Sequence, residues 1–494
     1  MTSPSPTTSR VDMAWLTSGR PLAIAHRGAS AYAPDNTLAA FALADVLGAD
    51  MWEVDIQLSS DGIAVVCHDS DLNAVAGRDE PVSALSAEDL STLATLSGEP
   101  IPLFSQVVEL AQAKGAALYL DVKNSAAYEA TLRVLQDTNF ERAVFGINDP
   151  AFCRKLVDGG CPYPVSILFG IGKDPFEMAE LSGADILHPC WERAGDRPDR
   201  LLTPAFFAEA QRRGLPVVTW HEERPDVAAS LLQLPVAGIC SDTPQLLKSY
   251  RHRFPDAPEV VCHRGACAIA PENTLASAHA AFAAGFHVVE LDVRQIADGS
   301  LAVFHDHKLE RTTDGTGPVA AQTADSLQDL DAGSWFSRHY TGEPVPFLSE
   351  LLTCATIWSG QLYIELKETD PAAILSEVER HDFFGNCFFW SFNAEYLQQM
   401  KALEPRARFM ARREDYDSIE ACLADLSPVI VEFNQDNLDP VDLDKVRACG
   451  ARIMIAYMGR DREIQERIRQ LRPDLVNIND LFGWSRLIET ASAN

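Results

Sequence analysis

The chain has 494 residues, about twice the length of a typical (β/α)8 barrel of roughly 250 residues. Its formal net charge of −30 would repel the phosphates of DNA or RNA, which argues against a nucleic-acid-binding protein. The 11 cysteines are odd in number and form no C-x-x-C pair. These features argue against a disulfide scaffold or a zinc site and favour a reducing compartment.

The N-terminal segment carries no targeting pattern. Residues 1–10 are rich in Ser, Thr and Pro and lack the charged and apolar regions of a secretory signal. No apolar run approaches the 18 or more residues of a transmembrane helix. We therefore expect a cytoplasmic protein without a transmembrane segment. Residues 1–20 are expected to be a flexible leader with one short amphipathic stretch at 13–16.

The first regular elements are expected directly after this leader. Residues 22–25 form an apolar run typical of a buried parallel strand, and His26 follows at its C-terminal end. Residues 37–48 have a helical apolar pattern, with Asn36 or Thr37 as the N-cap. In the next expected strand, 51–55, alternation places Glu53 and Asp55 on the same side.

A third strand is expected at 63–68, after the Asp61-Gly62 turn. Roughly a dozen residues separate Asp55 from His68. A helical crossover needs at least that many residues in addition to its flanking strands. We therefore expect the second and third strands to be joined by an extended excursion and not by a helix.

Strands and helices then alternate. Further strands are expected at 118–123, 144–147, 165–169, 186–188 and 217–220, with helical patterns between them such as 206–213. This alternation is typical of a parallel α/β fold, and about eight strands in each half favour a barrel over an open sheet. The first strand is not followed by G-x-G-x-x-G, which argues against a dinucleotide-binding fold.

The second half repeats the first at a spacing of 237 residues. The repeated segments are His26-Arg27-Gly28 and His263-Arg264-Gly265, Pro34-Asp35-Asn36-Thr37 and Pro271-Glu272-Asn273-Thr274, Glu53-Val54-Asp55 and Glu290-Leu291-Asp292, and His68-Asp69 and His305-Asp306. Further along, Asp121 corresponds to Glu365 at a spacing of 244. The repeat predicts two α/β domains, each a (β/α)8 TIM barrel, at 21–252 and 258–494. The boundary is expected in the polar stretch 250–258, which contains two prolines.

The repeated residues have the chemistry of a phosphoester site. In the second half they are expected at or near the C-terminal ends of strands, which converge on one face of a barrel. The carboxylates of Glu290, Asp292 and Glu365 suit a hard divalent cation such as Mg²⁺ or Ca²⁺. His263 and His305 could act as acid and base. Arg264 and Lys367 carry positive charge suited to phosphate oxygens, so the set fits metal-assisted hydrolysis of a phosphate ester.

The first half contains a matching set: His26, Arg27, Glu53, Asp55, His68, Asp121 and Lys123. Each residue taken alone also has a structural interpretation, for example a turn glycine or a helix cap. The joint repetition shows that the halves share an ancestor. The chemical hypothesis depends on these residue types meeting on one face.

The motifs H-R-G, P-E-N-T, E-x-D, H-D followed by L-x-R-T-T, and I-E-L-K resemble those of the glycerophosphodiester phosphodiesterase family. The likeness covers nearly the whole chain as two tandem copies. It implies TIM barrels that use a divalent metal to hydrolyse glycerophosphodiesters, the deacylated phospholipid head groups, to an alcohol and sn-glycerol 3-phosphate.

The resemblance also implies roles for the repeated residues. Metal ligands would be Glu290, Asp292 and Glu365, and in the first half Glu53, Asp55 and Asp121. The acid/base pairs would be His263 with His305 and His26 with His68. The substrate phosphate would contact Arg264 and Lys367, or Arg27 and Lys123.

The first half departs from the family pattern at Asp121, where the family has Glu. An Asp carboxylate reaches roughly 1–1.5 Å less far, comparable to the difference between direct and water-mediated metal binding. This half also lacks the counterparts of Arg311-Thr312-Thr313 and of Trp335-Phe336. We expect a competent second half. The first half is either active with altered metal or substrate preference, or mainly structural.

Two alternatives remain open at this stage. A lysophospholipase D-like or lyase activity would call for an apolar entrance or a membrane-binding surface. A phosphodiester-binding module would keep the fold and have one or both sites silent. The head group, the choice between Mg²⁺ and Ca²⁺ and the oligomeric state are not fixed by these motifs.

Overall fold

The computed structural model describes residues 11–17, 19–247, 257–337 and 340–493. The chain divides into two compact units, Met1–Lys248 and Ser249–Asn494, called here the first and the second barrel. Most of the expected boundary at 250–258 lies outside the described residues, as do residues 1–10 of the expected leader.

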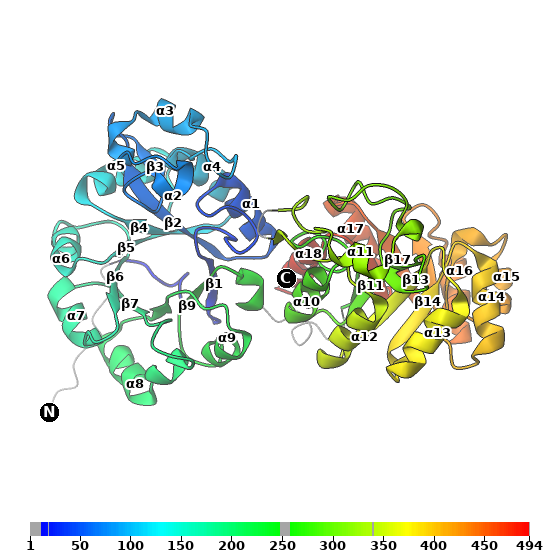
Figure 1. Cartoon of the computed structure of the whole chain (residues 1–494). Coiled ribbons are helices and arrows are strands. Elements are labelled where there is room, and N and C mark those ends of the chain that lie inside the picture. The colour runs from blue at the N-terminus through cyan, green and yellow to red at the C-terminus, as the bar shows by residue number, and fades with distance from the viewer. Residues whose placement is uncertain (1–10, 18, 248–256, 338–339, 494) are drawn as a thin grey trace. The chain divides into compact units, whose positions relative to one another are not determined.

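Eight parallel strands form the first barrel (Figure 1). They are β1 Leu22–Ala25, β2 Met51–Leu58, β4 Ala117–Val122, β5 Ala143–Ile147, β6 Val165–Gly170, β7 Ile186–Cys190, β8 Val218–Thr219 and β9 Gly238–Ser241. Their order is β7-β6-β5-β4-β2-β1-β9-β8. A parallel bridge between Leu187 and Val217 joins the two ends of this order and closes the barrel.

Helices surround these strands, as Figure 1 shows. They are α1 Leu38–Val46, α4 Phe104–Lys114, α5 Ser125–Asp137, α6 Pro150–Asp158, α7 Pro175–Ser182, α8 Pro204–Arg213 and α9 Pro225–Leu231, with 3-10 turns at Pro198–Leu201 and Pro244–Leu247. The helix expected at 37–48 is α1, and Thr37 is its N-cap, whose hydroxyl accepts from the amide of Ala40 at 3.1 Å.

The second barrel repeats this plan. Its parallel strands are β10 Glu259–Cys262, β11 Val288–Gln295, β13 Gln361–Leu366, β14 Cys387–Trp390, β15 Met410–Arg412, β16 Ile430–Asn434, β17 Arg452–Tyr457 and β18 Leu475–Ile478. Their order is β14-β13-β11-β10-β18-β17-β16-β15, and a parallel bridge between Phe389 and Phe409 closes it.

The helices of this barrel are α10 Leu275–Ala283, α12 Leu348–Ile357, α13 Pro371–Arg380, α14 Ala394–Leu403, α15 Ile419–Asp425, α16 Pro440–Cys449, α17 Arg462–Gln470 and α18 Leu481–Ala493, with 3-10 turns at Phe384–Asn386 and Arg413–Asp415. The prediction of two tandem (β/α)8 TIM barrels is thereby confirmed. None of the helices in the described part of the chain is long and apolar enough to cross a membrane.

The strand expected at 63–68 differs from the prediction. It is a three-residue strand, β3 (Ala64–Val66), which pairs antiparallel with β2 and lies outside the barrel. Its counterpart β12 (Leu301–Val303) pairs antiparallel with β11. His68 and His305 therefore follow hairpin strands and not barrel strands. The hairpin still carries them back to the site, because the amide of Phe304 donates to the carbonyl of Asp292 at 2.9 Å.

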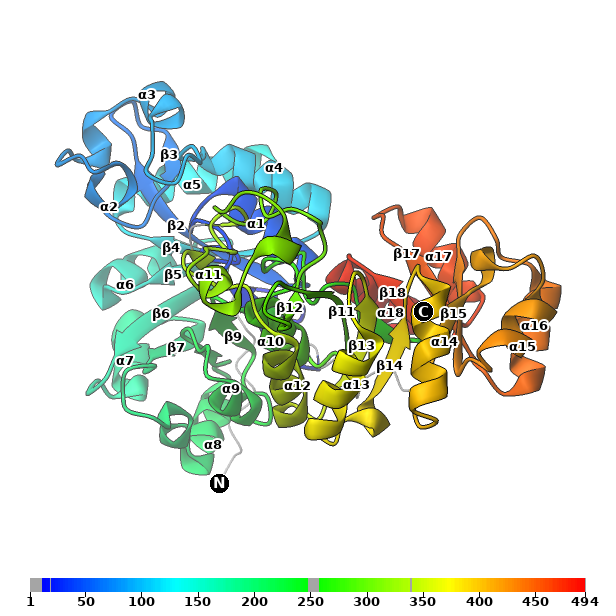
Figure 2. The same cartoon turned by 45° about the vertical axis from the view of Figure 1, so that its right-hand side comes forward.

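Each hairpin opens a small subdomain beside its barrel. In the first barrel it holds α2 (Asn73–Ala76), a 3-10 turn at Val82–Ala84 and α3 (Ala87–Thr92), which group around β3 in Figure 2. In the second it holds a 3-10 turn at Val319–Ala321 and α11 (Ala324–Gln328). Each has its own apolar cluster, which includes Leu72 and Leu90 in the first barrel and Leu309 and Leu327 in the second.

Part of the expected flexible leader is packed. Met13 and Leu16 are buried, with 9% and 0% exposure, in an apolar cluster that includes Ile24 and Met51 of the first barrel's strands. The amphipathic stretch thus contributes to the core of the first barrel, because its apolar side chains cover strand residues there.

Candidate active site

In each barrel three carboxylates meet at adjacent strand positions. Asp292 on β11 lies beside Glu365 on β13, and Glu290 precedes Asp292 by two residues on the same side of β11. Their ligand atoms lie within 4.8 Å of one another and all three side chains are buried. Glu53, Asp55 and Asp121 meet the same limits in the first barrel. The shorter Asp121 is therefore still a member of its cluster.

The H-R-G turn brings its backbone against this cluster. Arg264 and Gly265 both have left-handed φ values, 56° and 81°, and the amide of Arg264 donates to Oε2 of Glu290 at 2.8 Å. A Cβ on Gly265 would lie 2.8 Å from the carbonyl carbon of Ser277, so the turn requires glycine. In the first barrel, Arg27 makes the same bond to Glu53 at 2.9 Å.

Two cations hold the central aspartate. Lys367 pairs with Glu365, and its Nζ lies 3.1 Å from Asp292, while Nε of Arg264 lies 3.4 Å from Asp292. In the first barrel, Nζ of Lys123 lies 2.7 Å from Asp55 and 2.6 Å from Asp121. Arg27 lies 3.1 Å from Asp55. The predicted cationic residues thus contact the carboxylates directly.

An asparagine is a further part of the site, at a position where the sequence predicts only a turn and helix cap. Nδ2 of Asn273 donates to Asp292 at 2.8 Å, and its Oδ1 accepts from the Asp292 amide at 3.2 Å. Asn36 makes the same two bonds to Asp55. The asparagine is repeated in both P-[DE]-N-T segments, and a helix cap needs only the neighbouring Thr. This repetition could have indicated a role for the asparagine in the site.

The electrostatics of the cluster favour a bound cation. Burial raises the pKa of Glu290 well above its usual value, and the charges of Asp292 and Glu365 raise it further. Burial raises the pKa of Glu365 to about 7, with a contribution from Asp292. In the first barrel, Oε1 of Glu53 is buried and has no hydrogen-bond partner among the described residues. Three oxygen ligands with repelling charges and a spare acceptor fit Mg²⁺ or Ca²⁺.

The two predicted histidines of the second barrel stand near this cluster. Nδ1 of His263 bonds Oδ1 of Asn479 at 2.7 Å, and its Nε2 lies 3.9 Å from Oε2 of Glu290. Burial, followed by the charge of Arg264, lowers the pKa of His263 to about 4. Nδ1 of His305 bonds Asp306 at 2.6 Å, and burial lowers its pKa. Because each Nδ1 is engaged, each Nε2 remains for a substrate.

Arg311 of the R-T-T motif ties these parts together. It donates to Asp306 at 2.6 Å and to Glu272 at 2.7 Å, and Glu272 also accepts from Arg264 at 2.7 Å. The network joins Asp306, the hydrogen-bond partner of His305, to Arg264.

In the first barrel His26 has a different partner from His263, whereas His68 keeps the counterpart of the His305 partner. Nδ1 of His26 bonds the carboxylate of Asp242 at 2.6 Å, and its ring stacks on His221 at 4.8 Å with an interplanar angle of 7°. His26, His221 and Asp242 are close enough to hold a metal, but the in-plane lone pairs of two parallel rings cannot meet at one ion. His68 bonds Asp69 at 2.7 Å and its side chain is 42% exposed.

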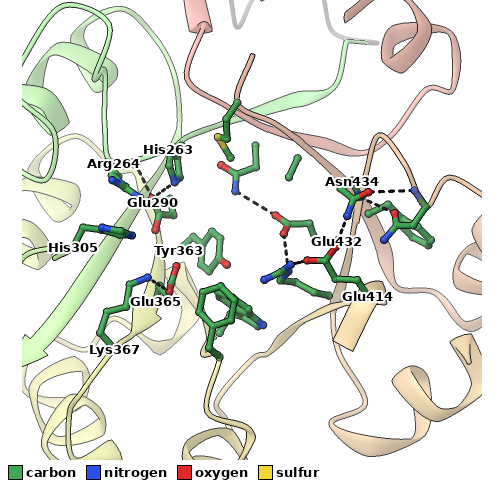
Figure 3. A pocket seen from close by; sticks show the side chains of 18 residues that line it. His263, Arg264, Glu290, His305, Tyr363, Glu365, Lys367, Glu414, Glu432 and Asn434 are labelled. Carbon is green, nitrogen blue, oxygen red and sulfur yellow. Dashed lines mark hydrogen bonds and ion pairs between the residues drawn. The ribbon is translucent and has the colours of Figure 1, made fainter. Parts of the chain in front are cut away.

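A cavity of about 270 Å³ lies over the site of the second barrel. On one side are the predicted residues, and on the other is a polar group that includes Glu414, Glu432 and Asn434 (Figure 3). The predicted residues that line it are His263, Arg264, Glu290, His305, Glu365 and Lys367. Asp292 is buried beneath them and is not part of the lining.

The chain matches the model of the glycerophosphoryl diester phosphodiesterase family at residues 26–159 and 263–453, more than half of its length. A glycerophosphodiester phosphodiesterase of Bacillus subtilis is 31% identical over 213 residues, which cover 37% of this chain and 72% of that protein. One from Caldanaerobacter subterraneus is 28% identical over 240 residues, 46% of this chain and 96% of that protein. A putative glycerophosphodiester phosphodiesterase of Bacillus subtilis is 37% identical over 160 residues. This chain covers 63% of that protein, just under two thirds of its length.

Among solved structures, the glycerophosphodiester phosphodiesterase of Agrobacterium tumefaciens is 35% identical, with a TM-score of 0.44, 46% of this chain covered and 99% of that chain. An Oleispira antarctica phosphodiesterase solved with the product sn-glycerol-3-phosphate is 28% identical, with a TM-score of 0.44, 49% of this chain covered and 100% of that chain. The family match in two regions, together with the repeated carboxylate and histidine geometry, shows that the chain belongs to the glycerophosphoryl diester phosphodiesterase family, as two tandem copies of its domain.

Proposed function

We propose that the chain hydrolyses glycerophosphodiesters to an alcohol and sn-glycerol 3-phosphate with a bound divalent metal, Mg²⁺ or Ca²⁺, in the cytoplasm. We propose the second barrel as the main catalytic unit and the first as a site of altered preference. The observation that carries the proposal is the meeting of three buried carboxylates, two histidines, an arginine and a lysine around one cavity.

The carboxylates of Glu290, Asp292 and Glu365 would hold the metal, which would stabilise charge on a phosphoryl oxygen. Asn273 and the Arg264 amide fix the orientation of Asp292 and Glu290. The cationic groups of Arg264 and Lys367, both at the cavity, would bind the remaining phosphate oxygens.

His263 and His305 would move the protons of the reaction. Hydrolysis requires one proton to leave the attacking water and one to reach the departing alcohol. His263 is neutral at pH 7, because its pKa is about 4, and its Nε2, 3.9 Å from Glu290, suits a proton acceptor. His305 is held by Asp306, and its Nε2 supplies a second proton-transfer atom.

The division of work between the barrels rests on their surroundings. In the second barrel, Arg311 and Glu272 fix the partner of His305 and the position of Arg264. In the first, the side chains of His68 and Asp69 are 42% and 45% exposed. A loosely held catalytic pair is expected to lower the rate, since misplacement of reacting groups is costly.

The test is metal-dependent product release by the full chain. The protein is treated with EDTA, then assayed for sn-glycerol 3-phosphate from glycerophosphoethanolamine with no metal, Mg²⁺ or Ca²⁺. We expect no release without metal and release with one of the two ions. Glu290→Gln should lose the metal-restored activity of the second barrel, whereas Glu377→Gln, buried on the outer helix α13, should keep it. Activity that persists undiminished in EDTA would contradict the metal-dependent site.

A further inference from the structure

The two barrels share their carboxylate clusters and differ on later strands. β2 and β4 carry Glu53, Asp55 and Asp121 where β11 and β13 carry Glu290, Asp292 and Glu365. Strand register extends the comparison. Asp121 pairs with Gly146, where Glu365 pairs with Trp390, and Leu168 pairs with His188, where Arg412 pairs with Glu432. The second barrel thus has an aromatic and an ion pair where the first has a glycine, a leucine and a histidine.

In the second barrel Trp390, Arg412 and Glu432 all line the cavity, and Figure 3 shows Glu432 on the side opposite the histidines. Glu432 is 9% exposed and accepts from Nδ2 of Asn477 at 3.2 Å. Nε of Arg412 lies 3.9 Å from the other oxygen of Glu432. Arg412 also pairs with Glu414, which accepts from Asn434. A buried charged group costs free energy unless hydrogen bonds or an opposite charge satisfy it. The charged groups on this side of the cavity therefore suit a polar ligand.

Some hydrogen-bonding capacity on this side is unused. Oδ1 of Asn477, a residue 5% exposed, is buried and has no hydrogen-bond partner among the described residues. Nδ2 of Asn437 is in the same state. Both residues line the cavity. The cavity lining therefore offers one unpaired acceptor, on the Asn477 side chain that bonds Glu432, and one unpaired donor, on Asn437. A hydroxyl group can satisfy either kind.

The aromatic residues do not favour a cationic ligand. Cζ of Arg412 lies 5.0 Å from the ring centre of Trp390 and 5.1 Å from that of Phe392. Nζ of Lys367 lies 5.4 Å from the Phe392 ring. Protein cations already occupy these faces, so a quaternary ammonium would meet like charge there. Carboxylates, carboxamides and a guanidinium instead match the donors and acceptors of adjacent hydroxyl groups.

We propose that Glu432, Asn477, Asn437 and Arg412 form a polyol subsite that binds a neutral, polyhydroxylated group esterified to the substrate phosphate. This deepens the proposed function and rests on it. The first barrel has Leu168 and His188 at the corresponding positions and lacks the subsite. The duplication has therefore given the two barrels different preferences for the organic part of the diester.

The test compares substrates in a chain whose first barrel is silenced by His26→Ala. Rates are measured for glycerophosphoinositol, for glycerophosphocholine and for methyl 4-nitrophenyl phosphate, a diester without glycerol. The variants are Glu432→Gln and Asn477→Leu. Glu377→Gln is the matched control, because Glu377 is also 9% exposed but lies on α13, outside the cavity. Circular dichroism and thermal unfolding check that each variant is folded.

If the subsite binds the head alcohol, Glu432→Gln lowers kcat/KM for glycerophosphoinositol by roughly tenfold to a hundredfold, mainly through KM, and changes the other two much less. If the subsite binds the glycerol of the substrate, Glu432→Gln lowers kcat/KM equally for both glycerophosphodiesters and leaves kcat/KM for the nitrophenyl ester unchanged. Either result supports a polyol subsite. Unchanged rates on all three substrates in both variants would overturn it.

A binding measurement separates this inference from the proposed function. Saturation-transfer NMR with free inositol and with free glycerol reports binding without turnover. Transfer to the wild-type chain that is lost in Glu432→Gln supports the subsite even if no diester is hydrolysed, in which case the proposed function alone fails. Absence of transfer with both polyols, in a chain that also shows no substrate preference, overturns the subsite.

Discussion

Asn273 shows how one uncharged residue can decide whether a carboxylate cluster works. It bonds both the side chain and the backbone of Asp292, and so fixes the middle carboxylate of three that repel one another. Partners that orient ligands commonly change metal affinity by about 10–100-fold when they are removed. Asn36 has the same position in the first barrel, which gives each barrel a matched variant.

Asn273→Ala is predicted to weaken the apparent affinity of the second barrel for its metal by about 10–100-fold. The measurement is the concentration of Mg²⁺ or Ca²⁺ that restores half of the activity after EDTA treatment. Asn36→Ala is the control and should leave this midpoint nearly unchanged. Equal midpoints for the wild type and Asn273→Ala would show that the asparagine is only a turn residue.

His188 makes the stability of the first barrel depend on pH. Its Nδ1 lies 2.6 Å from the hydroxyl of Tyr119, and its Nε2 is buried without a hydrogen-bond partner among the described residues. Burial, and then the charge of His26, lowers its pKa from 6.5 to about 3. Between these values the unfolded chain binds a proton that the folded barrel does not, so acid destabilises the fold.

The free energy of unfolding of the first barrel should therefore fall below pH 6.5, by up to about 1.4 kcal/mol per pH unit from this residue. His188→Gln should remove that part of the slope between pH 6.5 and 5. Hydrogen exchange of peptides from β4 and β7 in rising urea measures it in the full chain. His307→Gln, with a side chain 73% exposed, should not alter the slope. An unchanged slope in His188→Gln would contradict this assignment.

At the scale of elements, the H-R-G turn depends on its contact with the following helix. Gly265 faces Ser277 on α10 so closely that a Cβ would lie 2.7 Å from the Ser277 Cβ. Gly450, after α16, has the same φ of 81° and no atom within 4 Å of its Cβ position. Alanine substitutions at the two glycines therefore share the same backbone strain, but only the Cβ at position 265 would clash with a neighbouring helix.

Gly265→Ala is predicted to lower the free energy of unfolding by about 1–3 kcal/mol more than Gly450→Ala, as in other overpacked sites. It should also abolish the activity of the second barrel, because the displaced turn carries the Arg264 amide away from Glu290. Denaturant unfolding and phosphodiesterase assays of the two variants measure this. Equal destabilisation by the two substitutions would mean that the turn can move away from α10 at little cost.

The same scale shows what the amino-acid pattern could not decide. Residues 63–68 read as a strand, and β3 exists, but apolar alternation is identical in parallel and antiparallel strands. The direction follows from the short Asp61-Gly62 turn, which allows only a hairpin. Likewise the apolar residues Met13 and Leu16 indicated an amphipathic segment, but its burial depends on a cluster formed by strands from the whole barrel.

The polar half of the cavity was beyond sequence inference for a related reason. Glu432 is the one charged residue of β16, and its partner Asn477 is 45 residues away. Their strands, β16 and β18, lie on either side of β17, so only the folded sheet brings the two side chains together. The half with the histidines and the carboxylate cluster was predictable because its residues lie in repeated motifs. The sequence spacing of repeats can be recognised without knowledge of the fold.

For the whole molecule, the net charge of −30 must be overcome locally before a phosphodiester can bind. Arg264, Lys367 and Arg311 supply cations beside the second site, where their own carboxylate partners partly neutralise them. A bound divalent metal would complete this local reversal of charge. The tandem arrangement gives one chain two similar carboxylate clusters with different surroundings.

The most direct measurement compares sn-glycerol 3-phosphate release by the wild type, His26→Ala, His263→Ala and the double variant, each with the activating metal. Loss of a proton-transferring residue lowers its own site's rate by about 10²–10⁴-fold. We predict that His263→Ala loses most of the activity, that His26→Ala keeps most of it, and that the double variant retains almost none. Full activity in His263→Ala together with loss in His26→Ala would contradict the assignment of the barrels. A wild-type chain that releases no product from any glycerophosphodiester with either metal would contradict the proposed phosphodiesterase activity.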